Sequence, residues 1–242
     1  MLAVQIDQYL ARRAELEKRS PEYHERCWDC LRPKVVCYCS SIKKFNPGIK
    51  FVILTHLIEF RRRIASGRMS YLCLQESEFI VGLDFAEDRQ VQAIVDNEKF
   101  DSYVLYPGED SLNLSDLSEP SRLDRFYSDK QLCIFVVDGT WNTAKKMINR
   151  SPNLVDLPRI CFTPETQSNF RVRKQPGQHC LSTIEAIHQC IELLGPSRGF
   201  DLESGQHHNL LEAFDSMVDK QIEYINQSKI ENRGSRHKRG RA

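Results

Sequence analysis

The chain has 242 residues, of which 40% are hydrophobic, and its 34 basic and 33 acidic residues leave a formal net charge of +1. This length suits one large domain with attachments, and so balanced a charge leaves any nucleic-acid contact to local basic clusters. The longest apolar run, residues 51–58, is too short to span a bilayer, which excludes a membrane-spanning protein. Nine cysteines without a signal-peptide pattern predict a soluble cytoplasmic protein with reduced thiols.

The order of elements along the chain predicts an α/β fold. Residues 5–18 have the pattern of a charged amphipathic helix, and residues 26–45 are cysteine-rich without a clear period. From Lys50 onward, strand-like runs alternate with helix-like runs, which is typical of a parallel sheet. The polar loops at 107–130 and 163–180 are long for a compact domain, and such loops are usually functional or disordered. The strand-like runs are 50–55, 79–81, 102–106, 132–137 and 159–162, and the helix-like runs lie near 59–75, 87–97, 140–149, 182–194 and 208–226.

The first motif is a cluster of cysteines, Cys27-x-x-Cys30 followed by Cys37-x-Cys39. Four thiolates this close in the chain can close tetrahedrally around one Zn²⁺ ion. A thioredoxin-like redox pair at Cys27 and Cys30 would leave Cys37 and Cys39 unexplained, and four unrelated thiols would not account for the density. We therefore predict a structural zinc knuckle, and we expect most of the other cysteines to be buried as small hydrophobic residues.

The second motif is Asp138-Gly139-Thr140-Trp141, which directly follows a strand-like run and precedes a helix pattern. In open parallel sheets, ligands bind at the carboxyl ends of strands beside the next helix N-terminus. Asp138 therefore lies where a catalytic or ligand-binding carboxylate is expected. The alternative is that Asp138 or Thr140 only caps the helix, since both residue types are favoured there. The local pattern favours the cap, whereas Trp141 and the downstream segment favour a site.

Other segments suit a binding site, each with a structural alternative. Gly108 follows a strand and lets the backbone turn sharply, although Pro-Gly marks many turns. Residues 168–176 place basic residues around Phe170, which fits an RNA backbone with a stacked base, or equally a solvated strand edge. Ser182 and Glu185 form the S-x-x-E pattern of a capping box, which does not exclude a ligand at the same helix start.

The histidines and the arginine run are less informative. His56 ends a strand-like run and fits a hydrogen-bonded structural histidine as well as a site residue. The basic run at 61–63 fits a solvated helix face. His207 and His208 have the pattern of exposed loop residues.

Together these motifs resemble the DTW-domain family of tRNA-uridine aminocarboxypropyltransferases. The resemblance covers roughly residues 26–195, with five motifs in the family's order. Three positions depart from the family: Leu57 replaces a frequent proline, Phe170 replaces a usual tyrosine, and Asn-Thr is absent before Gly67. The motifs are the cysteine cluster with Arg32-Pro33, His56-x-x-Glu59, Leu105-Tyr106-Pro107-Gly108, Asp138-Gly139-Thr140-Trp141-x-x-Ala144-x-Lys146-Met147, and Leu181-Ser182-Thr183-x-Glu185-Ala186.

The resemblance implies a SPOUT-related parallel sheet with a trefoil-knotted cofactor site, S-adenosylmethionine as donor, and a tRNA uridine, at variable-loop position 47, as acceptor. The product would carry a 3-amino-3-carboxypropyl group on N3. Asp138 is the candidate catalytic base, because N3 must lose its proton to become a good nucleophile. The implied cofactor-binding residues are Tyr106, Pro107, Gly108, Asp138, Gly139, Thr140, Trp141, Leu181, Ser182, Thr183 and Glu185, and the candidate RNA-binding residues are Arg61, Arg62, Arg63, Arg68, Phe170, Arg171, Arg173 and Lys174.

The expected organisation is an N-terminal helix at 1–25, a zinc knuckle at 26–45, a catalytic domain at 46–227 and a basic disordered tail at 228–242. The expected partner is tRNA, with no membrane and no obligate protein partner, and we expect a monomer. Zinc would be structural or an RNA clamp, since the transfer needs no metal. Two other functions stay open: a non-catalytic zinc-knuckle RNA-binding protein, and a SPOUT-type RNA methyltransferase that transfers a different carbon of the same donor.

Overall fold

A computed structural model of the chain describes residues 25–62, 64–172 and 180–239. The chain divides into two compact units, residues 1–40 and 41–242, and each is described by itself. The N-terminal helix predicted at 1–25 lies outside the described residues, except for its last residue.

The described part of the first unit is a tight loop that carries the cysteines. The Cys27 N–H donates a hydrogen bond to the Arg32 carbonyl at 2.8 Å. Leu31 has a positive φ of 58°, which turns the chain back within this loop. Two 3₁₀ turns follow, η2 (Lys34–Val36) and η3 (Cys39–Ser41). The absence of a clear period in this part of the sequence thus reflects a segment made of turns.

The second unit is built on a six-stranded parallel sheet with the order β2-β1-β5-β3-β6-β4. This confirms the predicted parallel α/β architecture. Each predicted strand is present within two residues of its expected bounds, and β4 is an addition that the sequence pattern did not indicate. The strands are β1 (Lys50–His56), β2 (Glu78–Gly82), β3 (Phe100–Leu105), β4 (Leu112–Asn113), β5 (Gln131–Asp138) and β6 (Arg159–Cys161).

The central strands β1 and β5 are continuous apolar runs because both faces of the sheet are covered. Phe51 and Ile53 of β1 and Phe135 of β5 are fully buried. The register pairs Thr55 of β1 with Asp138 of β5, so the carboxyl ends of the two strands are level. The residues that follow these strands therefore begin at the same edge of the sheet.

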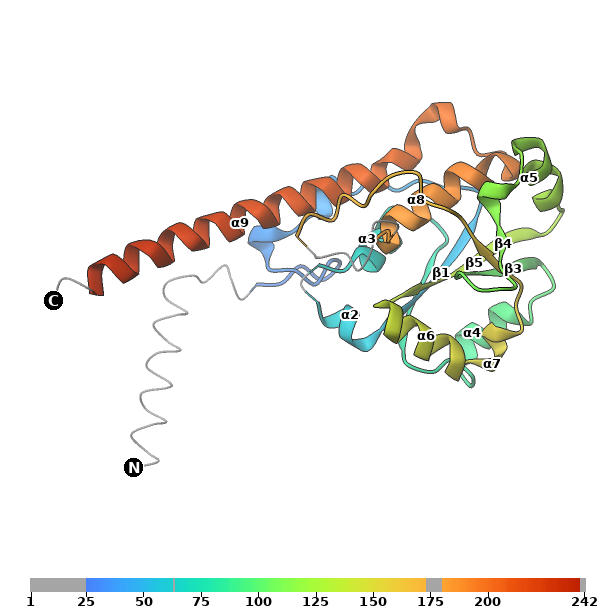
Figure 1. Cartoon of the computed structure of the whole chain (residues 1–242), viewed down its shortest axis with the longest axis horizontal. Coiled ribbons are helices and arrows are strands. Elements are labelled where there is room, and N and C mark those ends of the chain that lie inside the picture. Colours follow the sequence, from blue (N-terminus) through green and yellow to red (C-terminus); the bar gives the residue numbers. More distant parts are fainter. Residues whose placement is uncertain (1–24, 63, 173–179, 240–242) are drawn as a thin grey trace. The chain divides into compact units, whose positions relative to one another are not determined.

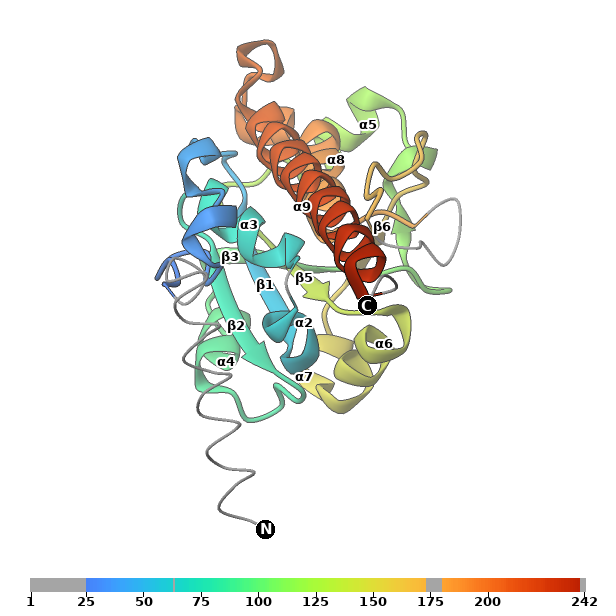
Figure 2. The ribbon, with the colours of Figure 1, turned by 90° about the vertical axis from the view of Figure 1, so that its left-hand side faces the viewer.

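Helices cover the two faces of the sheet (Figures 1 and 2). They are α2 (Leu57–Arg61), α3 (Ser66–Cys73), α4 (Arg89–Val95), α5 (Glu119–Phe126), α6 (Trp141–Arg150), α7 (Pro152–Val155), α8 (Thr183–Leu194) and α9 (Asn209–Arg239), with 3₁₀ turns η4 (Leu114–Asp116), η5 (Gly195–Arg198), η6 (Leu202–Ser204) and η7 (Gln206–His208). On one face α3, α8 and α9 pack against one another. On the other face, α4, α6 and α7 close a core that includes Val52, Phe135 and Met147.

The helix predicted near 59–75 is wrong as a single element. The chain forms α2 and α3 instead, and Arg62 ends α2 in an extended conformation with its N–H bonded to the Glu59 carbonyl at 3.0 Å. The break is explained by tertiary packing, which the local hydrophobic pattern does not indicate. It lets α3 start in a new direction and bring Gly67 against the end of β5, where Gly67 contacts Asp138.

Two other stretches are more regular than predicted. The expected loop at 107–130 contains β4, η4 and α5, and Ser118 caps α5 through a hydrogen bond from the Ser121 N–H. The expected disordered tail is also corrected over much of its length, because α9 continues to Arg239. The polar composition of the tail did not indicate this continuation. The helix starts at Asn209, and near its start Leu210 and Phe214 are buried in the domain. Among the residues that the structure describes, none of the helices combines the length and apolar character needed to cross a membrane.

The central strand makes a stability prediction possible. Phe135→Ala should lower the free energy of unfolding by about 3–5 kcal/mol, because it removes a fully buried aromatic ring and leaves a cavity. Urea denaturation followed by circular dichroism measures this change. Tyr127→Ala is the matched control, since this aromatic side chain is 76% exposed, and it should change the free energy by about 0.5 kcal/mol or less. Equal effects of the two substitutions would contradict the assigned core.

Candidate active site

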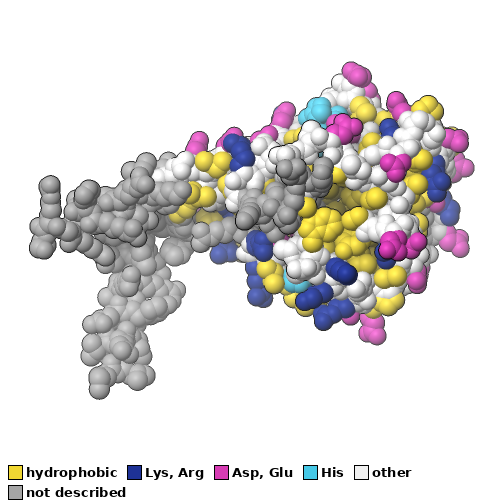
Figure 3. All heavy atoms as spheres, viewed as in Figure 1, with side chains coloured by type: hydrophobic (Ala, Val, Ile, Leu, Met, Phe, Trp, Pro, Cys, Tyr) yellow, Lys and Arg dark blue, Asp and Glu magenta, His cyan; other side chains and the backbone are white. Residues whose placement is uncertain are grey.

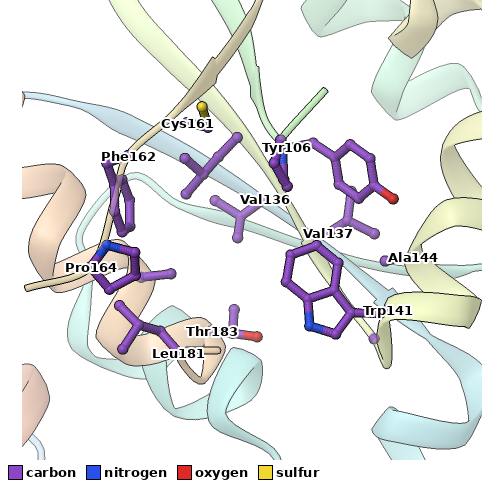
Figure 4. Close-up of a pocket in the computed structure, with 14 residues that line it drawn as sticks. Tyr106, Val136, Val137, Trp141, Ala144, Cys161, Phe162, Pro164, Leu181 and Thr183 are labelled. Atoms are coloured by element: carbon purple, nitrogen blue, oxygen red, sulfur yellow. The ribbon is translucent and has the colours of Figure 1, made fainter. Parts of the chain in front are cut away.

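A pocket opens at the carboxyl ends of β3, β5 and β6, beside the first turns of α6 and α8 (Figure 4). Its cavity volume is about 180 Å³. Trp141 and Tyr106 lie on one side of it and Phe162 and Leu181 on the other, and most of the lining side chains are apolar (Figure 4). Apolar walls with a few placed polar groups are typical of a small-molecule site. The lining residues are Leu105, Tyr106, Pro107, Val136, Val137, Gly139, Trp141, Ala144, Cys161, Phe162, Pro164, Leu181, Thr183 and Ala186.

The strand order explains why distant parts of the sequence meet here. β5 lies between β1 and β3, and β6 lies on the far side of β3. All carboxyl ends of a parallel sheet point to one edge, so the loops after β3, β5 and β6 emerge as neighbours. The motifs that begin at Leu105 and Asp138 are thereby placed next to each other, and the start of α8 at Thr183 closes the third side.

Thr140, not Asp138, is the N-cap of α6. The Thr143 N–H donates to Thr140 Oγ1 at 3.3 Å, and Asp138 is the last residue of β5, two positions earlier. Gly139 lies between them because a Cβ there would approach Thr143 Oγ1 to 2.7 Å. The structure therefore decides between the two candidate caps in favour of Thr140 and leaves the Asp138 carboxylate to face a different element.

That element is α8. Thr183 Oγ1 donates a hydrogen bond to Asp138 Oδ1 at 2.6 Å. Thr183 is the first residue of α8 and lines the pocket, whereas Asp138 is 5% exposed and lies behind it. The bond ties the central strand to a helix that starts 45 residues later.

Gly67 of α3 packs against the same carboxylate. A Cβ at this position would lie 2.5 Å from Asp138 Oδ2 and 2.7 Å from its Cγ. No residue larger than glycine fits unless the carboxylate moves, so α3 fixes the position of Asp138 from a third direction. Sequence reasoning treated Gly67 only as a place where the family pattern is incomplete, and it missed this contact. A glycine within a helical pattern, as at Gly67, was the feature of the sequence that could have indicated a close packing contact.

Glu185 caps α8 and also holds the loop before it. The Ser182 N–H donates to Glu185 Oε2 at 2.7 Å, which confirms the predicted capping box. The Asn169 N–H donates to the other oxygen at 2.7 Å, and the Ser168 hydroxyl donates to Oε2 at 2.6 Å. A buried carboxylate requires such donors. Glu185 thus positions the start of α8 and lies outside the lining of the pocket.

The aromatic wall is formed by Trp141 and Tyr106, and one hydrogen bond holds the indole of Trp141. Trp141 is 47% exposed, and its Nε1–H donates to Cys180 Sγ at 3.2 Å. The Tyr106 ring lies 6.3 Å from the Trp141 ring, centroid to centroid. Burial raises the pKa of Tyr106, although the nearby Arg159 acts in the opposite direction. The phenol therefore keeps its proton at neutral pH and can donate a hydrogen bond. An accessible indole beside a phenol suits a ligand with an aromatic ring or a cationic centre.

The predicted cofactor residues divide into two groups. Tyr106, Pro107, Gly139, Trp141, Leu181 and Thr183 line the pocket. The remaining five are not among the lining residues and are Gly108, Asp138, Thr140, Ser182 and Glu185. Sequence reasoning missed Phe162 and Pro164, which follow β6, because an apolar residue after a short strand carries no chemical signal.

The role predicted for Phe170 as a base-stacking residue is wrong. Phe170 is buried, and its ring packs edge-on against Phe214 of α9 with centroids 5.2 Å apart. Its neighbour Arg171 is exposed and forms an ion pair with Asp219 of α9 at 2.6 Å. These contacts make the segment part of the packing between the loop and α9. The predicted RNA contacts Arg173 and Lys174 lie outside the described residues.

The arginines near α2 have different environments. Arg61 is exposed, and Arg62 pairs with the buried Glu59 at 3.4 Å. The Arg68 guanidinium lies 4.8 Å from the centroids of two rings, Phe60 and Phe79, so its role includes packing. The predicted contact Arg63 lies outside the described residues.

A basic surface that sequence reasoning did not single out lies on α6. Lys145, Lys146 and Arg150 of this helix are exposed. Figure 3 shows Lys and Arg side chains around the position of α6, directly below a hollow lined by hydrophobic side chains. Because α6 also supplies Trp141 and Ala144 to the pocket, cationic groups and the pocket mouth share one helix.

The histidines that the sequence pattern drew attention to have different environments. His56 is the N-cap of α2, where its Nδ1 accepts from the Ile58 N–H at 3.1 Å, so it is a structural histidine. His208 is exposed, as expected. The prediction of an exposed loop residue is wrong for His207, which is 2% exposed and packs against His188 and Phe200.

The four clustered cysteines come together within the first unit. The Sγ atoms of Cys27 and Cys39 are 3.6 Å apart, as are those of Cys30 and Cys37, and all four lie within 4.8 Å of one another. Four thiolates around one zinc ion, with Zn–S bonds of about 2.3 Å, have sulfur–sulfur separations of about 3.8 Å. The cluster is therefore a set of four cysteines whose spacing fits a zinc ion.

Comparison with known proteins identifies the family. The DTW domain matches residues 24–222, which covers both the cysteine cluster and every segment that lines the pocket.

This chain belongs to the DTW domain family.

Curated relatives of this DTW protein are named transferases. It is 30% identical to tRNA-uridine aminocarboxypropyltransferase 2 of Drosophila melanogaster over 181 residues, which covers 72% of the chain and 68% of the relative. It is 28% identical to the protein of that name from Mus musculus, covering 74% of the chain and 58% of the relative. Identity to tRNA-uridine aminocarboxypropyltransferase A of Arabidopsis thaliana is 22%, over 88% of each chain. The chain thus spans less than two thirds of the mouse relative. No solved structure matches it significantly.

The contact between Gly67 and Asp138 predicts an inverted substitution effect. Gly→Ala within a helix usually stabilises a protein by about 0.5–1 kcal/mol. In this DTW protein, Gly67→Ala should instead lower the free energy of unfolding, because the added Cβ meets Asp138 Oδ2 at 2.5 Å. Urea denaturation of Gly67→Ala, Asp138→Ala and the double variant measures the coupling. Removing the carboxylate should relieve much of the penalty, and additive effects in the double variant would contradict the contact.

Proposed function

We propose that this protein transfers the 3-amino-3-carboxypropyl group of S-adenosylmethionine to N3 of a tRNA uridine. The observation that carries the proposal is the convergence of three sequence motifs of the DTW family on one pocket, with the buried Asp138 behind the Thr183 hydroxyl. The names of the relatives support the same reaction class. The variable-loop uridine at position 47 and the knotted cofactor site stay predictions from the family resemblance.

The pocket walls suit the donor. S-adenosylmethionine combines an aromatic base with a sulfonium cation, and the pocket offers the Trp141 and Tyr106 rings beside apolar side chains. Stacking and cation–π contacts with these rings would hold both parts of the donor. The sulfonium carries three carbons, and the one that reacts is the one held in line with the nucleophile at near-attack distance. The pocket therefore determines which group is transferred.

Asp138 and Thr183 would supply the proton acceptor. Uridine N3 carries a proton and becomes a good nucleophile only as the proton leaves. Thr183 lines the pocket and donates to Asp138, so N3–H can pass its proton to Thr183 Oγ1 while the threonine proton moves to the Asp138 carboxylate. N3 then forms a bond to the methylene carbon of the aminocarboxypropyl group. The carbon–sulfur bond breaks, and its electron pair leaves on sulfur as a neutral thioether.

The exposed cations of α6 would orient the tRNA. Lys145, Lys146 and Arg150 lie on the helix that supplies Trp141, so phosphate contacts there would bring a nucleotide to the pocket mouth. Phosphate contacts of this kind position a nucleic acid without reading its sequence. Arg61 and Arg171 stay candidates for the same role, although Arg171 would first have to leave its ion pair with Asp219.

The cysteine cluster would hold one structural zinc ion. Its four sulfurs have the mutual distances that tetrahedral thiolate ligands require. A closed set of four thiolates leaves no position for substrate, so the ion would stabilise the knuckle and take no part in the transfer.

Two substitutions test the proton path. Asp138→Asn should keep the hydrogen bond from Thr183, because the amide oxygen accepts it, but it should lower the single-turnover rate constant by about 10²-fold or more, since the amide takes no proton. Thr183→Val should have a similar effect, and Thr183→Ser should retain most of the activity. The measurement is single-turnover transfer to unmodified tRNA, followed by mass analysis of the nucleosides. Near-wild-type turnover of Asp138→Asn would exclude the proton path.

The same mass analysis separates the alternative functions. A methylated uridine would identify a methyltransferase. Binding of tRNA without any product in the presence of donor would identify a non-catalytic RNA-binding protein. The convergence of the motifs on an apolar pocket favours an enzyme over the latter.

The zinc assignment has its own test. Replacing Cys27 and Cys30 by serine should remove one equivalent of zinc per chain, because a site with two of four thiolates loses most of its affinity. Elemental analysis of the purified protein after desalting measures the metal content. Cys161→Ser is the matched control, since this cysteine lies on β6 and should leave the zinc content unchanged. Unchanged zinc in the double variant, or thiols paired as disulfides, would overturn the assignment.

A further inference from the structure

A cluster of three histidines lies where α8 meets the turn η7. The cluster consists of His188 on α8 with His207 and His208 on η7, and a ligand atom of each lies within 4.8 Å of the others. Glu192, one turn after His188, lies beside them with its carboxylate 3.5 Å from His188 Nδ1 and 3.8 Å from His207 Nε2. Three imidazoles around one point form a typical ligand set for a divalent transition metal, and a carboxylate near the other ring nitrogen of a ligating histidine is typical of such sites.

The distances within the cluster fit a shared ion. His188 Nε2 and His208 Nδ1 are 3.0 Å apart. Two imidazole nitrogens bound to one metal at about 2.0–2.1 Å lie about 2.9 Å apart at a right angle and about 3.4 Å apart at a tetrahedral angle. The nitrogens therefore already have the separation of neighbouring ligands. A direct hydrogen bond between the two rings is the alternative interpretation of the same distance.

His207 favours the metal over the hydrogen bond. It is 2% exposed, and its Nδ1 is buried without a hydrogen-bond partner among the residues that the structure describes. A buried polar atom of this kind costs free energy unless something satisfies it. The rings of His207 and His208 are only 4.0 Å apart, centroid to centroid, so water has little room between them. A metal ion held by the cluster would help to compensate for this crowding of polar rings in a buried place.

The cluster is in the form that binds metals and has an entry path. Burial, reinforced by the neighbouring rings, lowers the pKa of His188 to about 4, so this imidazole is neutral at pH 7. A neutral imidazole binds a metal without first losing a proton. His188 and Glu192 also line a second hollow of about 350 Å³ next to the loop at 165–169, through which an ion can reach them.

We propose that His188, His207 and His208 form a second metal site that binds a divalent transition-metal ion such as Zn²⁺, with Glu192 beside the rings of His188 and His207. The inference is independent of the transfer reaction and of the cysteine cluster, with which it shares no residue. The ion would join α8 to η7 and thus to the start of α9. Because α8 begins with Thr183, a clamp on this helix would also steady the residue that holds Asp138.

The test is a zinc titration of the full-length chain against a chromogenic chelator. The wild-type protein should bind about two equivalents of Zn²⁺, one at the cysteines and one at the histidines. His208→Ala should weaken one of the two by about 100-fold or more, since removing even an indirect supporting group often costs 10–100-fold in metal affinity. His208 is exposed, so this variant should keep its fold, as circular dichroism would verify.

Two controls make the outcome decisive. Gln206→Ala, next to the cluster and exposed, should behave as wild type. In the variant with serine at positions 27 and 30, the remaining ion should still be lost on His208→Ala, and Co²⁺ bound to it should lack thiolate charge-transfer absorption. Absence of bound Zn²⁺ in the variant with serine at positions 27 and 30, or equal affinities in His208→Ala and Gln206→Ala, would overturn the proposal and leave a hydrogen-bonded histidine cluster.

Discussion

The hydrogen bond from Thr183 to Asp138 is the contact on which the geometry of the site depends. It is 2.6 Å long and joins the end of the central strand β5 to the first residue of α8. Hydrogen bonds to a charged acceptor are stronger than those between neutral groups, and burial reduces competition from water. Gly67 on α3 restricts the position of this carboxylate sterically, since the carboxylate occupies the space in which a Cβ at position 67 would lie. Three elements from separate parts of the chain thus determine where one carboxylate lies.

Residues other than Asp138 cap the two helices at the pocket. Thr140 satisfies the N-terminus of α6, and Ser182 with Glu185 satisfies that of α8. Capping contacts contribute about 0.5–2 kcal/mol each, so every helix start at the pocket has its own local stabilisation. Asp138 is consequently free of the capping role that its position in the sequence suggests. Glu185 likewise lies outside the pocket lining, where its carboxylate accepts hydrogen bonds from Ser168 and Asn169 and so orders the loop before α8.

The walls and surroundings of the pocket differ in chemical character, which suits two unlike substrates. The interior presents Trp141, Tyr106 and aliphatic side chains, which would contact the proposed donor, whereas the adjoining α6 presents cations toward solvent. A nucleic acid held by phosphate contacts on that helix would approach the pocket from its open side. The histidine cluster and the cysteine cluster contribute no residue to the lining of the pocket, and they would stabilise the elements rather than enter the reaction.

The sequence by itself determined the features that depend on near neighbours in the chain. Alternating strand and helix patterns were enough for a parallel α/β sheet, and the Ser182–Glu185 capping box is a contact across three residues. The spacing of Cys27, Cys30, Cys37 and Cys39 likewise predicted a cluster within one short segment. The family motifs named most of the lining of the pocket, because two of the three lie at strand ends and all strand ends of a parallel sheet share one edge.

Only the tertiary structure decided which of those residues touch. Which partner the Asp138 carboxylate meets depends on where α8 lies, and the burial of Phe170 depends on α9, which comes more than 35 residues later. The break between α2 and α3 and the gathering of His188, His207 and His208 have the same origin. Each results from contacts between segments far apart in the chain, set by strand order and helix packing. A local pattern records the preferences of a segment, but it does not record which partner that segment will meet.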